Sequence, residues 1–165
     1  MVFIMLLLFT NNAWGWISSS EKDKMTGEIS AGAISAQTKP LEDMPFPYQD
    51  IKSWIVFGCN KKGSEWVGII FSQRPNLTNS KTQDGYNLIT ERIKWDDLVT
   101  SITFAQNWGS RVLLFQDDQK NIQNIMTKSI MLLELSWYGE GVVYFQYSLK
   151  GSSKAIQDAR NICRK

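Results

Sequence analysis

The side chains that could catalyse a reaction in this 165-residue chain are carboxylates and serines, because the sequence contains no histidine. Without an imidazole, Ser–His and Cys–His catalytic pairs and histidine metal ligands are excluded. The clearest acidic candidates are two pairs of neighbours, Asp96 with Asp97 and Asp117 with Asp118. Neighbouring side chains on a strand point to opposite faces, so neither pair could present both carboxylates to one substrate. We interpret these residues as turn-forming and helix-capping aspartates.

The serines offer no better nucleophile. Ser152 and Ser153 lie in the segment GSSK, which lacks the S-x-x-K spacing of a Ser–Lys pair. A helix N-cap accounts for both residues. The acidic loops contain no D-x-D-x-D-G series of calcium ligands. The sequence therefore predicts no catalytic residue, no metal site and no cofactor.

Two of the seven tryptophans indicate a binding surface. Trp95 directly precedes two aspartates, and Trp108 precedes Gly-Ser-Arg, so both are expected at strand ends beside loops. Aromatic side chains in such places stack on sugars or anchor protein interfaces. Arg92 and Arg111 would add a polar rim to that surface. The alternative for both tryptophans is burial in the core.

The N-terminal residues are typical of an export segment. Residues 2–9, VFIMLLLF, are apolar throughout and too few to span a bilayer, which takes about 20 residues. Ala13 and Gly15 supply the small side chains that a signal peptidase requires. We predict a signal peptide over residues 1–15 and a single domain over residues 16–165. No Lys or Arg precedes the apolar run, and the alternative is a buried N-terminal strand.

The two cysteines fit an oxidising compartment. Cys59 and Cys163 are 104 positions apart and form no C-x-x-C motif, which argues against a zinc site or a thioredoxin-like centre. Two cysteines in an exported protein most simply form one disulfide. The alternative is a pair of buried free thiols.

The elements that must position these residues are mainly strands. Short apolar or alternating segments predict strands near residues 24–35, 53–59, 65–71, 87–95, 98–104, 110–116, 130–137 and 142–149. Helical spacing of apolar residues predicts a short helix near 118–127 and a C-terminal helix near 153–163, capped by Ser152 or Ser153. We expect an antiparallel β-sandwich of about seven or eight strands. A curved sheet that carries the C-terminal helix is the alternative.

Three polar segments separate these elements. Residues 16–24 are Ser-rich and are expected to be weakly ordered. Residues 40–47 contain three of the four prolines and are expected to form a surface loop. Residues 72–86 are expected to form a long loop of the kind that often carries function. The net charge of +2 is too small for a nucleic-acid-binding surface. Beyond residues 1–15, no stretch is apolar enough to span a membrane.

The order of several features resembles a known family. These features are the strand WIVFGC ending in Cys59, the hairpin strand EWVGIIF, the strand ITERIKWDD and the ending VYFQYSLKGSSKAIQDARNIC. Together, over residues 54–163, they resemble the type VI secretion-associated VasI/TagO-like periplasmic proteins. The resemblance implies a small disulfide-bonded envelope protein with an accessory role, and it implies no active-site residue.

Two functions follow from these observations. The first is an exported, non-enzymatic accessory or adaptor protein of the bacterial cell envelope, periplasmic or secreted, that binds another envelope protein. The alternative is a module that binds peptidoglycan or another glycan, or that inhibits a cell-wall hydrolase. Nucleic-acid binding is not expected.

Overall fold

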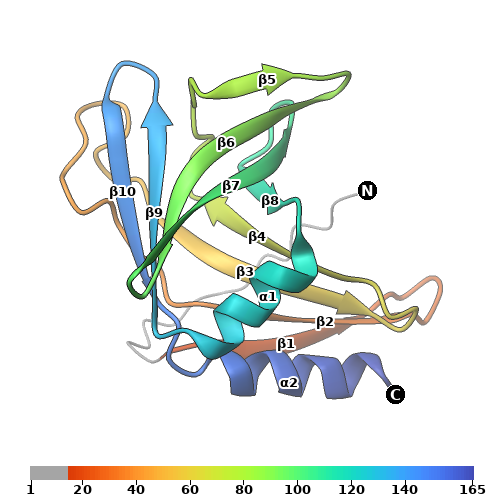
Figure 1. Ribbon diagram of the computed structural model, residues 1–165. Coiled ribbons are helices and arrows are strands. Elements are labelled where there is room, and N and C mark those ends of the chain that lie inside the picture. The colour runs from red at the N-terminus through yellow and green to blue at the C-terminus, as the bar shows by residue number, and fades with distance from the viewer. Residues whose placement is uncertain (1–14) are drawn as a thin grey trace.

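The computed structural model describes residues 15–165 (Figure 1). The predicted signal peptide therefore lies outside the described residues, apart from its last residue, Gly15. The described chain forms ten strands and two helices. In chain order they are β1 (Ile17–Lys22), β2 (Ile29–Ile34), β3 (Ser53–Asn60), β4 (Glu65–Phe71), β5 (Ser80–Thr82), β6 (Tyr86–Trp95), β7 (Leu98–Asn107), β8 (Val112–Phe115), α1 (Asp118–Thr127), β9 (Ile130–Trp137), β10 (Gly141–Ser148) and α2 (Ser152–Cys163).

All ten strands belong to one antiparallel sheet. Its order is β1-β2-β3-β4-β8-β7-β6-β9-β10, and β5 pairs with β6 beside this path. The predicted antiparallel, mainly β class and both helices are confirmed. The strands do not divide into two separate sheets, so the architecture is the curved sheet that carries the C-terminal helix (Figure 1).

The sheet curls until β10 faces the beginning of β3. The buried Tyr147 hydroxyl of β10 lies 2.6 Å from Ser53 Oγ of β3. The segment after β2 fills the space between these strands, since Thr38 pairs with Ser53 and Pro40 pairs with Phe145. Curling lets one sheet bury its own apolar face, as two sheets do in a sandwich.

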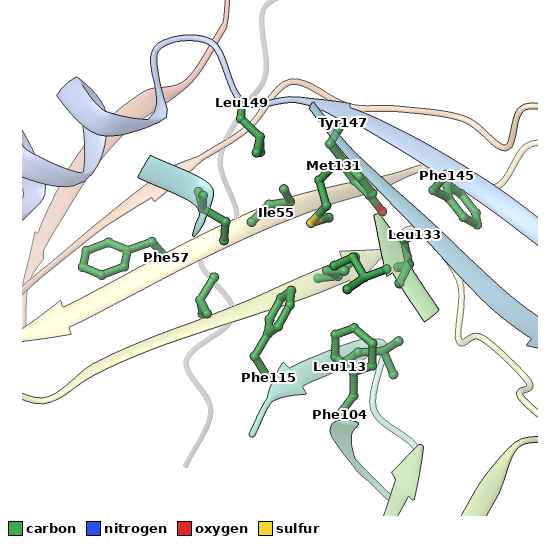
Figure 2. Close-up of a cluster of buried hydrophobic side chains, with 14 of the residues drawn as sticks. Ile55, Phe57, Phe104, Leu113, Phe115, Met131, Leu133, Phe145, Tyr147 and Leu149 are labelled. Atoms are coloured by element: carbon green, nitrogen blue, oxygen red, sulfur yellow. The ribbon is translucent and has the colours of Figure 1, made fainter. Parts of the chain in front are cut away.

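The core lies inside this curl. Figure 2 shows apolar side chains from β3, β8, β9 and β10 converging on one another, among them Ile55, Phe115, Leu133 and Phe145. The strands that contribute them alternate between buried and more exposed residues, which is the pattern of a sheet with one covered face. Aromatic rings meet edge to face at the closed end, where the ring centroids of Phe71 and Phe145 are 5.5 Å apart.

The opposite face carries a row of apolar residues that we call the outer row. Each member lies directly opposite the next on the neighbouring strand, from β1 to β6. Directly paired residues share a face, and apart from Ile17 every member is next in sequence to at least one buried residue that points into the core. The outer row consists of Ile17, Ile34, Val56, Gly68, Leu114, Ala105 and Leu88.

Both helices begin near the residues predicted from the sequence, but the N-cap of α2 differs from the predicted one. Asp117 caps α1, because its carboxylate accepts a hydrogen bond from the Lys120 N–H at 3.3 Å. Gly151 is the N-cap of α2, with φ of 92°, and it makes no side-chain cap. The prediction that Ser152 or Ser153 caps α2 is therefore wrong. The Ser152 hydroxyl instead donates to the Ile125 carbonyl of α1, which ties the two helices together.

A disulfide joins α2 to the sheet, as predicted. Cys59 at the end of β3 is bonded to Cys163 at the end of α2. Beside it, Arg160 forms a two-pronged ion pair with Glu65 of β4, with N–O distances of 2.7 and 2.8 Å. Together these bonds hold α2 against β1, β2 and β3 (Figure 1).

Two segments expected to be irregular form strands. Residues 17–22 pair with β2 in full register as the edge strand β1, and residues 80–82 pair with β6 as β5. Both strands consist mostly of polar residues, so they lack the apolar pattern that marks a strand in a sequence. Backbone hydrogen bonds to an existing neighbour hold them, and edge strands tolerate polar side chains.

We expect the double variant Cys59→Ser/Cys163→Ser to be less stable than the native chain by about 2–5 kcal/mol. The reason is that the disulfide closes a loop of 104 residues and so restricts the unfolded chain. Urea unfolding of the two proteins measures the difference. A reducing agent should destabilise the native chain and leave the double variant unchanged. Equal stability of the two proteins would contradict the prediction.

Candidate binding surface

The structure separates the two tryptophans of the predicted surface. Trp95 ends β6, and Trp108 follows β7, so they lie at opposite ends of one hairpin. Trp95 is only 2% exposed, since it shares the inward face of β6 with Ile89 and Ile93. The prediction that Trp95 belongs to a binding surface is therefore wrong, and the alternative, burial in the core, is correct. A strand residue directly before a turn can still point into the core. Trp108 is 60% exposed and remains a candidate.

Trp108 and Arg111 lie close together in the turn that joins β7 to β8. The Trp108 N–H donates to the Gly85 carbonyl at 3.1 Å, and Gly109 takes a φ of 78° that favours glycine. Arg111 donates from Nη1 to the Ser72 carbonyl at 3.1 Å. Both contacts fix this turn against the segment of residues 72–86. The turn therefore contains an exposed indole and, three residues further along the chain, a guanidinium that is bonded to the backbone.

Arg92 belongs to a different group, on the outward face of β6, β9 and β10. Its guanidinium donates to both carboxylate oxygens of Glu134, at 2.7 and 2.6 Å. The Tyr144 hydroxyl donates to the same carboxylate at 2.9 Å. The hydrogen bond from Arg92 lowers the pKa of Glu134. The hydrogen bond to that carboxylate also raises the pKa of Tyr144, so this network stays ionised at Arg92 and Glu134 near neutral pH.

A shallow acidic hollow adjoins Tyr144. Glu42, Asp43 and Glu140 are among the residues that line it, and none of the lining residues is basic. Its volume is about 70 Å³, far below the roughly 300–1,000 Å³ of a typical small-molecule site. The hollow therefore suits contact with a side chain of a larger partner rather than enclosure of a cofactor.

Exposed apolar residues belong to the same two segments as the residues that line this hollow. Phe46 is 84% exposed and Tyr138 is 67% exposed, and Leu41 and Val142 are also exposed. They come from the Pro-rich loop after β2 and from the β9–β10 hairpin, which lie side by side in Figure 1 because Leu41 bonds to Tyr144. We call this area the hairpin-end surface. It consists of Leu41, Glu42, Asp43, Phe46, Tyr138, Glu140, Val142 and Tyr144.

Sequence reasoning did not find this surface. Residues 40–47 were predicted as a loop, which is correct apart from the isolated bridge at Pro40, but no motif indicated that the loop would meet the β9–β10 turn. The meeting depends on contacts between residues about 100 positions apart. The only signal in the sequence was the presence of apolar residues within a Pro-rich, acidic segment.

Glu91 is a buried carboxylate that the sequence analysis also missed. It is 4% exposed and lies where the edge of β6 changes partners, between its pairing with β9 and its pairing with β5. Ser136 donates to it from its backbone N–H at 2.9 Å and from its hydroxyl at 3.1 Å. Burial raises the pKa of Glu91, although the bonds from Ser136 act in the opposite direction. Its alternation with Ile89 and Ile93 was the signal that it points inward.

The paired aspartates have structural roles, as interpreted from the sequence. Asp96 adopts a φ of 51° in the β6–β7 turn and accepts hydrogen bonds from the Ser129 and Ile130 N–H groups. Asp118 accepts one from the Val67 N–H at 3.0 Å, and burial raises its pKa. Within residues 15–165, no three Cys, Asp or Glu side chains are grouped so that they could hold a metal ion.

Comparisons of the chain with the models of known protein families, with curated proteins and with solved structures found no match. The resemblance to the VasI/TagO-like periplasmic proteins therefore stays a prediction. Neither helix of the described chain is long and apolar enough to cross a membrane.

We expect Glu91→Gln to remove one pH dependence of stability. Because burial raises the folded-state pKa of Glu91 above its ordinary value of 4.5, the folded protein holds this proton more tightly than the unfolded chain. The resulting stabilisation is complete below about pH 4.5 and is lost as the pH rises through the raised folded-state pKa. Glutamine does not ionise, and it keeps an oxygen that can accept from the Ser136 N–H.

Urea unfolding of both proteins from about pH 4 to about pH 8 measures this effect. The native chain should lose stability relative to the variant as the pH rises, and the difference should level off once Glu91 is ionised. All other titrating groups are common to both proteins and cancel in the comparison. A difference that does not vary with pH would show that the folded-state pKa of Glu91 is not raised.

Proposed function

We propose that this protein is an exported, non-enzymatic accessory or adaptor protein of the bacterial cell envelope, and that it binds another envelope protein. The observation that carries the proposal is the hairpin-end surface, which combines exposed aromatic and aliphatic side chains with carboxylates. Interfaces are enriched in aromatic anchors with a polar rim. The protein's net charge is +2, so this acidic area contrasts with the molecule as a whole.

The chemistry of the surface defines the partner that we propose. Phe46 and Tyr138 offer large apolar contact areas, and Glu42, Asp43 and Glu140 offer negative charge beside them. A partner segment that carries basic side chains next to apolar ones would complement both features. The Arg92–Glu134–Tyr144 network borders the surface and would hold the Tyr144 side chain in one orientation.

Export is the second part of the proposal. The disulfide between Cys59 and Cys163 supports an oxidising compartment. The apolar run of residues 2–9, with small residues at 13 and 15, supports secretion into such a compartment. The resemblance to VasI/TagO-like proteins favours type VI secretion as the context.

We expect the double variant Glu42→Lys/Glu140→Lys to bind the envelope partner about ten-fold more weakly than the native chain, because like charges would then oppose a basic partner. The partner is first identified by brief crosslinking in the periplasm, affinity capture and mass spectrometry. Its affinity is then measured with both purified proteins at low and high salt. The control is Asp97→Lys, an exposed carboxylate-to-lysine change in the β6–β7 turn that carries half of the double variant's charge change, and it should bind normally.

Three outcomes would count against the proposal. They are the recovery of no specific partner, an equal loss of affinity in the Asp97→Lys control, and an affinity that does not vary with salt. The last outcome would show that the carboxylates do not face basic groups, since interactions between exposed charges weaken as salt increases.

One observation favours the alternative function, which is binding to peptidoglycan or inhibition of a cell-wall hydrolase. The Trp108 indole is exposed in the same turn as Arg111, and exposed indoles stack on sugar rings. We expect Trp108→Ala to abolish sedimentation with purified sacculi if this function is correct, whereas Phe46→Ala should sediment normally. For the adaptor function, the same two variants should have the opposite effects on partner affinity. Native-level sacculus binding by Trp108→Ala would rule out the glycan-binding function at this turn.

A further inference from the structure

Exposed aliphatic side chains gather where the β6–β7 turn meets the start of β9. Leu98 is 60% exposed, Val99 is 53% exposed and Ile130 is 43% exposed. Ile130 lies beside the turn, because the Asp96 N–H donates to the Ile130 carbonyl at 3.0 Å. We call Leu98, Val99 and Ile130 the aliphatic tip. In Figure 1 the β6–β7 turn and the start of β9 lie together, and the β9–β10 turn lies at the far end of β9.

The aliphatic tip projects from the molecule rather than forming one flat patch. Leu98 and Val99 are neighbours on β7, so their side chains point to opposite sides of the hairpin. Leu98 pairs with Trp95 in the last pair before the turn. A protein partner would have to enclose the turn to contact both side chains, whereas a fluid lipid surface can surround it. The shape therefore favours insertion of the turn into the surface of a bilayer.

Three lysines lie around the aliphatic tip. Lys94 pairs directly with Val99. Lys128 comes two residues before Ile130, and Lys150 comes two residues after the β10 residue that pairs with Ile130. None of the three lysines forms an ion pair within residues 15–165. Their charges are therefore available to an anionic surface.

Two carboxylates lie at the same end. The Asp96 carboxylate accepts hydrogen bonds from the backbone N–H groups of Ser129 and Ile130 at 3.0 and 2.9 Å, so it is turned toward the protein. Asp97 is exposed. The lysines outnumber these carboxylates, and this surplus of positive charge complements the phosphates of anionic lipids.

The described chain also begins at this end. The Trp16 indole donates from Nε1 to the Ser148 carbonyl at 3.1 Å, and Ser148 pairs with Ile130. A signal peptide over residues 1–15, as the sequence predicts, would bring this end of the fold to the membrane during export. Tryptophan is also a residue that favours the headgroup level of a bilayer.

We propose that the aliphatic tip binds the surface of a bilayer that contains anionic lipids, with Lys94, Lys128 and Lys150 placed among the headgroups. The aliphatic side chains would enter the boundary between headgroups and acyl chains, and the lysine stems would lie along them while the ammonium groups reach phosphate. The proposal goes beyond the adaptor function and does not rest on it. The hairpin-end surface lies at the other end of β9, so a protein bound there would leave the tip free.

Flotation with lipid vesicles tests the proposal. The test uses residues 16–165, the form expected after cleavage, which contains every described strand, both helices and the disulfide. We expect this chain to float with vesicles of equal parts phosphatidylglycerol and phosphatidylcholine, and at least about ten-fold more weakly with phosphatidylcholine alone. High salt should weaken binding to the anionic vesicles. Failure to float, or equal binding to both kinds of vesicle, would overturn the proposal.

The double variant Leu98→Ser/Val99→Ser should bind the anionic vesicles about ten-fold more weakly than the native chain, because less apolar surface leaves water. The control is Leu41→Ser/Val142→Ser, which changes the same residue types on the hairpin-end surface. Their exposed fractions, 58% and 53%, nearly equal those of the tip residues. This control should bind vesicles normally and bind the envelope partner more weakly, so the two proposals can fail separately. An equal loss of vesicle binding in both variants would contradict the proposal.

The lysines are tested by Lys94→Gln/Lys150→Gln. This variant should lose about ten-fold in affinity for the anionic vesicles and should bind phosphatidylcholine as the native chain does. The control Lys24→Gln/Lys81→Gln removes two exposed lysines elsewhere and should have little effect. Asp97→Lys, which should leave partner affinity unchanged, should bind the anionic vesicles several-fold more strongly. Unchanged vesicle binding in both tip variants would overturn the proposal.

A photo-crosslinking measurement does not depend on affinity changes. Benzoylphenylalanine in place of Leu98 should crosslink to lipid in the anionic vesicles, whereas the same probe in place of Leu41 should not. Crosslinks from position 98 to a second copy of the chain, with none to lipid, would mean that the tip is a contact between copies. That result would overturn the proposal.

Discussion

Closure of one antiparallel sheet upon itself is the constraint on which the other features depend. A sheet this wide has a large apolar face to hide, and two short helices cannot cover it all. The sheet therefore curls, and the Tyr147–Ser53 hydrogen bond and the Thr38 and Pro40 bridges fasten its far strand near β3. The same curl carries the loop after β2 to the β9–β10 hairpin, and so it creates the hairpin-end surface.

Local features of this fold could be predicted from the sequence, and its long-range order could not. The hairpins β3–β4, β6–β7 and β9–β10 follow from apolar runs separated by short polar turns. The disulfide between Cys59 and Cys163 was predicted because two cysteines in an exported protein most simply pair with each other. No local pattern in the sequence predicts that β8 lies between β4 and β7 or that β9 lies beside β6. The edge strand β1 was missed for a related reason, since its serines are held by pairing rather than by burial.

The binding surface was harder to predict because exposure depends on tertiary contacts. Trp95 and Trp108 have similar settings in the sequence, yet one is buried and the other is open. Strand alternation decides this, since Trp95 follows Ile89 and Ile93 on the inward face, whereas Trp108 lies beyond the last residue of β7. Alternation also places Glu91 inside, where the bonds from Ser136 satisfy its carboxylate at the point where β6 changes partners.

The outward side of the sheet changes character from one half to the other. On β6, β9 and β10 it carries Arg92, Glu134 and Tyr144, which bond to one another and remain in contact with water. On β2, β3, β4 and β8 it carries Ile34, Val56, Gly68 and Leu114, which lie directly opposite one another, so packing rather than charge would hold a partner on this part of the sheet.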